Sequence, residues 1–484
     1  MGRRPKGITM VEPTESKAAA VVTHLTVSER ATGGQKARAA VPRAAHGEWA
    51  PASDRPDPVA ILEGQAATRV EDLVPIRYGR MAASPFAFYR GAAAVMANDL
   101  GAIPRSGLNV QLCGDAHLAN FGGFASPERN FVFDINDFDE THPGPFEWDV
   151  KRLAASLEIA GRGRQFTTKQ RDAVVTKAVG AYRDAIRTFA SMSNLDIWYA
   201  ELNIDGVISR WGREAGTQVI KNLQRAVTKA ESKDRLKAKA KLTELAHGEL
   251  RFVSNPPLLV PAENVLFELD REELERSIHA ALRLYRRTLT SDRRHLLEGY
   301  RFTHLARKVV GVGSVGTRSW VALLIGRDND DPLFLQVKEA EASVLEAYAG
   351  KSQFVNHGQR VVEGQRLMQA SSDIFLGWQH VDGVDGRVHD YYMRQLWDWK
   401  ASADLDFMSA DVMKVYGQMC GWALARAHAR SGDAIAIGAY LGKNSVFDSA
   451  LAQFARAYAD QNDVDHGALV GAISSGRVIA NSGI

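Results

Sequence analysis

The stretch that decides the fold reads KVVGVGSVGTRSWVALLIG and spans residues 308–326. Gly311, Gly313 and Gly316 stand in the spacing G-x-G-x-x-G, which occurs in dinucleotide-binding folds and in the phosphate loops of kinases. A dinucleotide-binding fold requires a helix directly after the glycines. Here TRSWVALLIG continues with the apolar pattern of a strand. The stretch therefore predicts two antiparallel strands joined by a glycine-rich turn that includes Ser314.

The next apolar segment, DPLFLQVKEA, predicts a further strand that carries Lys338. In protein kinases a glycine-rich loop covers the nucleotide phosphates, and a lysine on a following strand neutralises them. We therefore expect Lys338 to act catalytically on phosphate. Such a lysine is held by a glutamate from a helix. Glu363, in the helical stretch RVVEGQR, is the candidate, with Glu341 and Glu346 as alternatives.

A second motif, GDAHLANFG, occupies residues 114–122 and follows the apolar strand LNVQL. Asp115 and Asn120 have the Asp-x-x-x-x-Asn spacing of the kinase catalytic loop, which supplies a base for the acceptor hydroxyl and a magnesium ligand. Because Asp and Asn are also common turn residues, a purely structural loop is the alternative.

Acidic residues gather at the end of the next strand, FVFDINDFDE, residues 131–140. A carboxylate there is costly to bury unless it binds a metal or a hydrogen-bond donor. Hard oxygen ligands at this density suit Mg²⁺ or Mn²⁺ better than zinc. Asp137 and Asp139, together with Asn120, are the candidate metal ligands, and an acidic turn that caps the following helix is the alternative. The cluster consists of Asp134, Asn136, Asp137, Asp139 and Glu140.

Taken together, GDAHLANFG, INDFDE and PFEWDVKRLA resemble the catalytic and metal-binding motifs of aminoglycoside phosphotransferases and other kinase-like enzymes. The segments RYGRM, SPFAFYRGAA, VVEGQRLMQA, RQLWDWK and ALARAHARSGD resemble the bacterial family DUF2252, whose activity is unknown. The resemblance to kinase-like enzymes implies that Asp115 is the catalytic base and that Asn120 and Asp137 bind Mg²⁺. It also implies that Asp149 is a structural aspartate and that Lys338 neutralises the phosphates beneath the glycine loop.

Two positions and the order of the motifs depart from that pattern. Cys113 stands where the catalytic loop usually has histidine, and Asp139 replaces the glycine of a DFG-like motif. The glycine loop and Lys338 follow the catalytic-loop motif, whereas in kinases they precede it. A site depends on spatial arrangement, and chains with neighbouring termini tolerate permutation. We therefore expect an α+β, two-lobed kinase-like fold in circularly permuted order, with a helical insertion.

The expected organisation has five parts. They are a disordered tail at 1–55, the catalytic-loop and metal-binding segment of the large lobe at 56–155, a helical insertion or further large-lobe helices at 156–300, a small β-rich nucleotide-binding lobe at 301–398, and the C-terminal helices of the large lobe at 399–484.

Composition excludes several classes of protein. The chain has 484 residues, 60 Lys+Arg, 57 Asp+Glu and two cysteines, which argues against a disulfide framework and a cysteine-based zinc site. The net charge of +3 is too small to predict nucleic-acid binding. The basic stretch from Gln218 to Leu250 lacks aromatic residues for base stacking, so it predicts a solvated helix face. No signal peptide or membrane-spanning run is evident, so we expect a cytoplasmic protein without membrane or nucleic-acid partners.

The expected function is an ATP- and Mg²⁺-dependent phosphotransferase, with Mn²⁺ as an alternative metal and an unknown small-molecule or protein hydroxyl as acceptor. Arg394 and Lys400 are further candidates for phosphate or substrate contacts. Nucleotidyl transfer would use the same parts. Two other classes remain open, a non-catalytic nucleotide-binding protein and a metal-dependent phosphohydrolase built on Asp115, His117, Asp137 and His428.

Overall fold

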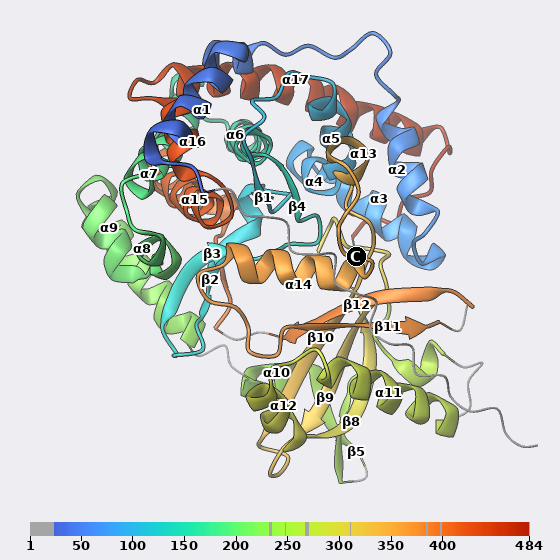
Figure 1. Cartoon of the computed structure of the whole chain (residues 1–484). Helices are drawn as coiled ribbons and strands as arrows, with labels where there is room; N and C mark the ends of the chain where they lie inside the picture. Colours follow the sequence, from blue (N-terminus) through green and yellow to red (C-terminus); the bar gives the residue numbers. More distant parts are fainter. Residues whose placement is uncertain are drawn as a thin grey trace, which may run out of the picture.

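The computed structural model describes residues 24–231, 235–246, 248–266, 271–309, 311–383, 386–396 and 399–483. It is a mixed α+β protein, with most helices gathered at one end and a six-stranded antiparallel sheet at the other (Figure 1). Among the residues described, no helix is long and apolar enough to cross a membrane.

The helical end is built largely from segments before residue 232 and after residue 409. Its helices are α1 (Val27–Ala40), α2 (Pro58–Ala66), α3 (Val74–Ala82), α4 (Pro85–Gly91), α5 (Ala93–Gly101), α6 (Phe146–Gly163), α7 (Thr168–Phe189), α8 (Asn194–Tyr199), α9 (Ile204–Glu231), α15 (Ala410–Ser431), α16 (Ala434–Leu441) and α17 (Val446–Ser474). Its strands are β1 (Asn109–Leu112), β2 (Phe121–Ala125), β3 (Phe131–Ile135), β4 (His142–Pro145) and β13 (Ala401–Ser402).

The other end is built around the six-stranded sheet, whose strand order is β11-β12-β10-β9-β8-β7. Its strands are β7 (Leu259–Pro261), β8 (Arg301–Lys308), β9 (Ser319–Ile325), β10 (Pro332–Ala340), β11 (Gly377–Asp382) and β12 (Val388–Gln395). Beside it lie α10 (Arg235–Leu242), β5 (Thr243–Ala246), β6 (Glu249–Phe252), α11 (Arg271–Arg286), α12 (Ser291–Glu298) and α14 (His357–Met368). Helix α13 (Glu346–Ala349) instead contacts α5 and β4 of the helical end.

Strand alternation explains why the sheet is covered on both faces. Val321 and Leu323 of β9 pack in one apolar cluster, while Ala322 and Leu324 pack in another on the opposite face. All nine residues of β10 are buried. The glycine-rich turn joins the antiparallel neighbours β8 and β9, as the sequence predicted.

The prediction of a helical insertion over residues 156–300 is wrong in its second half. Residues 243–261 form β5, β6 and β7, and β7 is an edge strand of the six-stranded sheet. Leu242 packs on one face of this sheet and Tyr285 on the other. The described residues from 235 to 300 therefore belong to the sheet end. The sequence did not reveal this packing because only one apolar stripe of each helix contacts the sheet, while the remaining helix faces are charged.

The prediction of a disordered tail is wrong for residues 24–55. Helix α1 packs against α16 so closely that a Cβ atom on Gly34 would lie 2.0 Å from the carbonyl oxygen of Ala436. Arg55 forms two buried ion pairs with aspartates of α5 and α17. Tertiary contacts order this segment despite its low apolar content, and residues 1–23 lie outside the described part of the chain.

Candidate functional site

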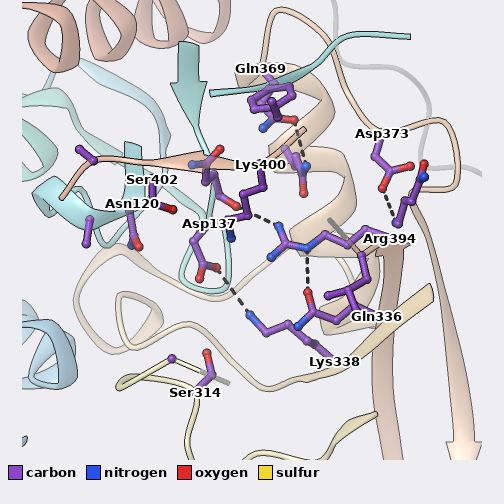
Figure 2. Close-up of a pocket in the computed structure, with 18 of the residues that line it drawn as sticks. Asn120, Asp137, Ser314, Gln336, Lys338, Gln369, Asp373, Arg394, Lys400 and Ser402 are labelled. Carbon is purple, nitrogen blue, oxygen red and sulfur yellow. Dashed lines mark hydrogen bonds and ion pairs between the residues drawn. The ribbon is translucent and has the colours of Figure 1, made fainter. Parts of the chain in front are cut away.

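A cleft of about 890 Å³ lies where the six-stranded sheet meets the helical end. Its walls come from the glycine-rich turn, from β10 and β12, from the loops after β1 and β3, and from the segment that precedes α15. Figure 2 shows Asp137, Lys338, Arg394 and Lys400 converging in it, with Asn120 and Ser314 nearby. The cleft thus brings together residues from three separated parts of the sequence.

One face of α6 anchors the loop that carries Asp115. Asp149 accepts hydrogen bonds from the backbone N–H groups of Cys113 (2.8 Å) and Gly114 (3.1 Å). One and two turns further along α6, Arg152 bonds the Asp115 carboxylate and Ser156 accepts from the Leu118 N–H. Since these α6 side chains lie on one helix face, the helix holds the loop at several points. The implied structural role of Asp149 agrees with these contacts.

The Asp115 carboxylate is held by a buried arginine and is partly open to solvent. Its Oδ1 lies 2.5 Å from Nε of Arg152, and its side chain is 18% exposed. Asn120 donates from Nδ2 to the backbone carbonyl of Asp115 at 2.8 Å. This bond orients the Asn120 amide, and both residues line a small cavity that adjoins the cleft. The two members of the predicted catalytic loop therefore lie together.

Lys338 is a buried cation held by two carboxylates from the loop after β3. Its Nζ lies 2.5 Å from Asp139 Oδ2 and 3.7 Å from Asp137 Oδ1. Tyr392 donates its hydroxyl to the other Asp139 oxygen at 2.5 Å, and Ser314 donates to Asp139 Oδ2 at 3.2 Å. Burial would lower the pKa of Lys338, but the two aspartates outweigh it and raise that pKa above its ordinary value.

The prediction that Glu363 holds Lys338 is wrong. Glu363 lies on α14, as expected, but its carboxylate pairs with Arg366 one turn away at 3.3 Å. The loop carboxylate of Asp139 occupies the position beside the lysine instead. A helix position cannot be matched to a strand lysine from spacing alone, because helix rotation decides which side chains face the sheet.

The acidic cluster of residues 134–140 divides into structural and cleft-facing members. Asp134 forms a fully buried ion pair with Arg426 of α15, so it is unsuited to bind a ligand. Glu140 accepts from the Val344 N–H at 2.8 Å, and burial raises its pKa to about 7. Asp139 is engaged by Lys338 and its neighbours. Asp137 is left as the carboxylate that faces the cleft.

Electrostatics keep Asp137 ionised. Burial by itself would raise its pKa, but the positive charges of Lys338 and Arg394 outweigh burial and lower it. An ionised carboxylate is the form that binds a divalent cation. No group of three His, Cys, Asp or Glu side chains that could hold a metal occurs within the described ranges.

Arg394 and Lys400 extend the positive charge of Lys338 along the cleft. Arg394 lies opposite Gln336 across the β10–β12 pair and donates to its side chain at 3.2 Å and to the Asn136 carbonyl at 2.9 Å. Lys400 lies in the cleft wall, where desolvation and the charge of Arg394 lower its pKa to about 8. Both residues therefore line the cleft, and their contact with phosphate or substrate stays a prediction.

The glycine-rich turn lies over the cleft and touches the N-terminal helices. Gly311 and Ser314 line the cleft, and Gly313 lies against the backbone of α4. Gly316 has φ of +91°, a backbone conformation that side chains rarely adopt, and its carbonyl accepts from the Val70 N–H at 2.8 Å. The turn is thus packed on α2–α4 and not only on its own sheet.

The histidines do not support the phosphohydrolase alternative. His428 is fully buried and contacts Tyr182 at 2.8 Å and Asp149 at 3.3 Å, so it braces the catalytic loop from behind. His117 is 3% exposed, and burial lowers its pKa to about 3. His117 lies 3.6 Å from Asp115, but the described residues contain no metal-binding group that joins both histidines with Asp115 and Asp137, so this alternative gains no support.

Sequence reasoning missed several residues that shape the site. Arg360 of α14 is buried and donates to the carbonyls of Asp139, Thr141 and Glu341, so it ties the β3 loop to the sheet. Arg152 could have been found from its spacing of three after Asp149 on α6. Tyr392 could have been found only after the β10–β12 register had placed it opposite Lys338.

Comparison with known proteins identifies a family. A family model described as "Uncharacterized protein conserved in bacteria (DUF2252)" matches residues 69–472. The chain belongs to the DUF2252 family. No curated protein and no solved structure matches it. The matched range of this DUF2252 protein includes the glycine-rich turn, Lys338, the catalytic-loop motif and the acidic cluster.

Proposed function

We propose that this DUF2252 protein is an ATP- and Mg²⁺-dependent phosphotransferase that acts on a hydroxyl acceptor. The observation that carries the proposal is the placement of Lys338 of β10 against Asp137 and Asp139. Figure 2 shows Lys338 and Asp137 in the cleft that Asn120 also lines. Asp115, whose carbonyl accepts from Asn120, lines the adjoining small cavity. Protein kinases combine a strand lysine, a metal-binding aspartate and a catalytic aspartate in this manner.

The order of elements at the sheet end supports a kinase-like lobe. Strands β8 and β9 flank the glycine turn, and β10, the third strand counted from β8, carries the lysine. Helix α14 follows before β11 and β12, and β7 is an additional edge strand that precedes β8. Kinases likewise place the glycine-rich loop first, the lysine on the third strand and a helix after it. The departure is the lysine partner, which here comes from the β3 loop.

Circular permutation would account for the reversed order of the motifs. The end of α15 lies against β1, since Ser431 Oγ accepts from the Gln111 N–H at 3.1 Å and a Cβ on Gly432 would lie 2.5 Å from a Val110 methyl. A chain that ran from the sheet end through α15 could therefore pass directly into β1 and the catalytic loop. Chains whose ends lie close together tolerate such permutation.

In the proposed reaction the acceptor hydroxyl attacks the terminal phosphorus of ATP. The bond from the acceptor oxygen to phosphorus forms, the bond from that phosphorus to the oxygen of ADP breaks, and Asp115 receives the hydroxyl proton. Arg152 holds Asp115 in place and stabilises its ionised form before transfer. Lys338 and the glycine-turn backbone would offset the phosphate charge, which is the main part of catalysis in this chemistry.

The residues present fit a magnesium–nucleotide complex. Asp137 and the Asn120 amide would hold the metal, which neutralises phosphate charge when bound. Magnesium in such sites commonly takes one or two protein oxygen ligands and completes its shell with phosphate oxygens and water. A site with few carboxylates, such as this one, therefore suits magnesium carried by a nucleotide.

Nucleotidyl transfer is the second candidate, and the positions of Arg394 and Lys400 favour it. These cations extend the positive charge of the cleft beyond Lys338. Arg394 pairs with Gln336 of β10, which lies further from the glycine turn than Lys338 does. If the β- and γ-phosphates of ATP bound Arg394 and Lys400, the α-phosphate would lie nearer to Asp115 than the γ-phosphate does. AMP, and not phosphate, would then be transferred, with pyrophosphate as the leaving group.

Product analysis with α- and γ-labelled ATP and Mg²⁺ tests both candidates, with water as the acceptor in the absence of a known one. Phosphotransfer yields ADP and phosphate, whereas nucleotidyl transfer yields AMP and pyrophosphate. Asp115→Asn, Asp137→Asn and Lys338→Met should each lower the rate by at least ~100-fold. Lys351→Met, at an exposed lysine outside the linings of the cleft and the small cavity, is the matched control. A wild-type protein that is neither stabilised by the non-hydrolysable analogue Mg-AMPPNP nor active would refute the proposal. If it binds Mg-AMPPNP without turnover, it is a non-catalytic nucleotide-binding protein.

A further inference from the structure

A second cavity, of about 130 Å³, adjoins the cleft beneath the glycine-rich turn. Asn120, Asp137, Gly311 and Ser314 line both spaces, so the two are continuous. Asp115 lines the smaller cavity but not the larger cleft. A group that occupied the small cavity would therefore lie beside the proposed catalytic base, on the far side from the nucleotide cations.

Arginines of the N-terminal helices also line this cavity. Arg77 of α3 and Arg90 of α4 line the cavity, together with Arg69, which precedes α3. Arg77 is 1% exposed and bonds the Gln65 side chain and the Gly91 carbonyl through Nη2 alone. Its Nε and Nη1, and the Nε of Arg90, are buried without a hydrogen-bond acceptor. A buried guanidinium nitrogen without a partner is costly, so it indicates a missing acceptor.

The carboxylates around the cavity do not supply that acceptor. Asp115 is paired with Arg152, Asp137 and Asp139 with Lys338, Glu339 with Arg318, and Glu140 with a backbone N–H. Among the described residues, neither Arg77 nor Arg90 has a carboxylate within ion-pair distance. Glu341 also lines the cavity, and its charge partly compensates that of Arg77. The two arginines therefore retain unused capacity for a compact anion.

From this geometry, and resting on the proposed function, we infer that the acceptor carries a phosphate or carboxylate group that binds Arg90 and Arg77. The anion would occupy the small cavity and direct the acceptor hydroxyl towards Asp115. Arg90, which is only partly buried and lines both spaces, would make the direct contact, and Arg77 would stand behind it. Guanidinium groups bind such oxyanions through paired hydrogen bonds. The substrate class is thus an anionic hydroxyl compound, for either transfer reaction.

Binding of inorganic phosphate in the presence of saturating Mg-AMPPNP tests the inference, by calorimetry and thermal shift. We expect phosphate to bind wild type alongside the nucleotide, and Arg90→Gln to weaken phosphate binding at least ~10-fold while Mg-AMPPNP binding stays unchanged. Arg80→Gln, on α3 but outside both linings, is the matched control and should leave phosphate binding unchanged. Arg77→Lys, which keeps the charge of the buried site, should also weaken phosphate binding.

Three results would overturn the inference. If the arginines served the nucleotide, phosphate would compete with Mg-AMPPNP, and such competition would assign them to ATP. Phosphate that fails to bind the nucleotide complex, or that binds equally to Arg90→Gln, would also refute an acceptor-anion site. In each of these cases Mg-AMPPNP still binds and the proposed function stands. Loss of Mg-AMPPNP binding in wild type itself would instead refute the proposed function.

Discussion

Replacing Asp139 by asparagine tests which carboxylate holds Lys338. Asp139 accepts from Lys338 Nζ at 2.5 Å, from the Tyr392 hydroxyl at 2.5 Å and from Ser314 Oγ at 3.2 Å. The asparagine keeps the shape and one acceptor oxygen but removes the charge. Lys338 is then left with Asp137, whose nearest oxygen lies 3.7 Å away.

The expected loss of stability follows from these contacts. Removing one partner of a buried ion pair costs about 3–5 kcal/mol, and a hydrogen bond to a charged group contributes about 1.5–3 kcal/mol. Asp139 is 29% exposed, so water replaces part of the interaction, and Asp137 supplies part of the remainder. We therefore expect Asp139→Asn to lower the free energy of unfolding by about 2 kcal/mol. Glu363→Gln, the matched change in the other carboxylate, should cost less than about 0.5 kcal/mol because its partner is a half-exposed Arg366.

Urea denaturation of Asp139→Asn, Lys338→Met and the double variant measures the coupling between the two side chains. We expect a coupling energy of about 1–2 kcal/mol for Asp139 with Lys338, and none above the error for Glu363 with Lys338. The two double variants combine Lys338→Met with Asp139→Asn or with Glu363→Gln. Because both contain the same lysine substitution, the effect of the lost lysine packing cancels between them. A coupling to Glu363 as large as that to Asp139, or no coupling to Asp139, would show that the assignment of the lysine partner is wrong.

Three other predictions concern the supports of the site. Asp149→Ala removes the acceptor for two buried backbone N–H groups, so kcat for ATP turnover should fall at least ~10-fold and stability by about 2–4 kcal/mol, measured by product assay and urea denaturation. Asp134→Ala leaves Arg426 unpaired and should cost about 3–5 kcal/mol, whereas Asp134→Leu with Arg426→Met should recover most of that loss, as measured by the same denaturation. The pKa of Lys400 is lowered to about 8, so Lys400 loses its proton as pH rises from 7 to 9, and the Kd of Mg-AMPPNP should increase several-fold over that range. Lys400→Arg stays charged and should flatten that pH dependence; an unchanged slope would show that another group titrates.

Local patterns were sufficient wherever neighbouring residues decide the structure. The apolar run after Gly316 predicted that the glycine turn joins antiparallel strands, and β8 and β9 confirm it. The Asp-x-x-x-x-Asn spacing predicted that Asp115 and Asn120 lie in one loop, where they share a hydrogen bond. The family is also confirmed by the match over residues 69–472.

Errors arose where long-range packing overrides local composition. The segment before residue 56 is rich in alanine and arginine and has little apolar periodicity, yet α1 is ordered by its contact with α16, some 400 residues away in the chain. The charged stretch from Arg235 to Leu242 looked like part of an independent helical insertion, yet its buried Leu242 joins the core of the sheet. Apolar content within a window does not report on partners outside that window.

By itself the sequence determined the mixed α+β class, through the periodicity of apolar residues along the chain, and the family, through the resemblance of its motifs. Only the tertiary structure decided that Asp139 and not Glu363 holds Lys338, that Asp134 and His428 brace the scaffold, and that Arg77 and Arg90 lie beside Asp115. Side-chain pairing depends on helix rotation, strand register and the approach of distant segments. None of these is set by spacing in the chain, because each results from the packing of the whole molecule.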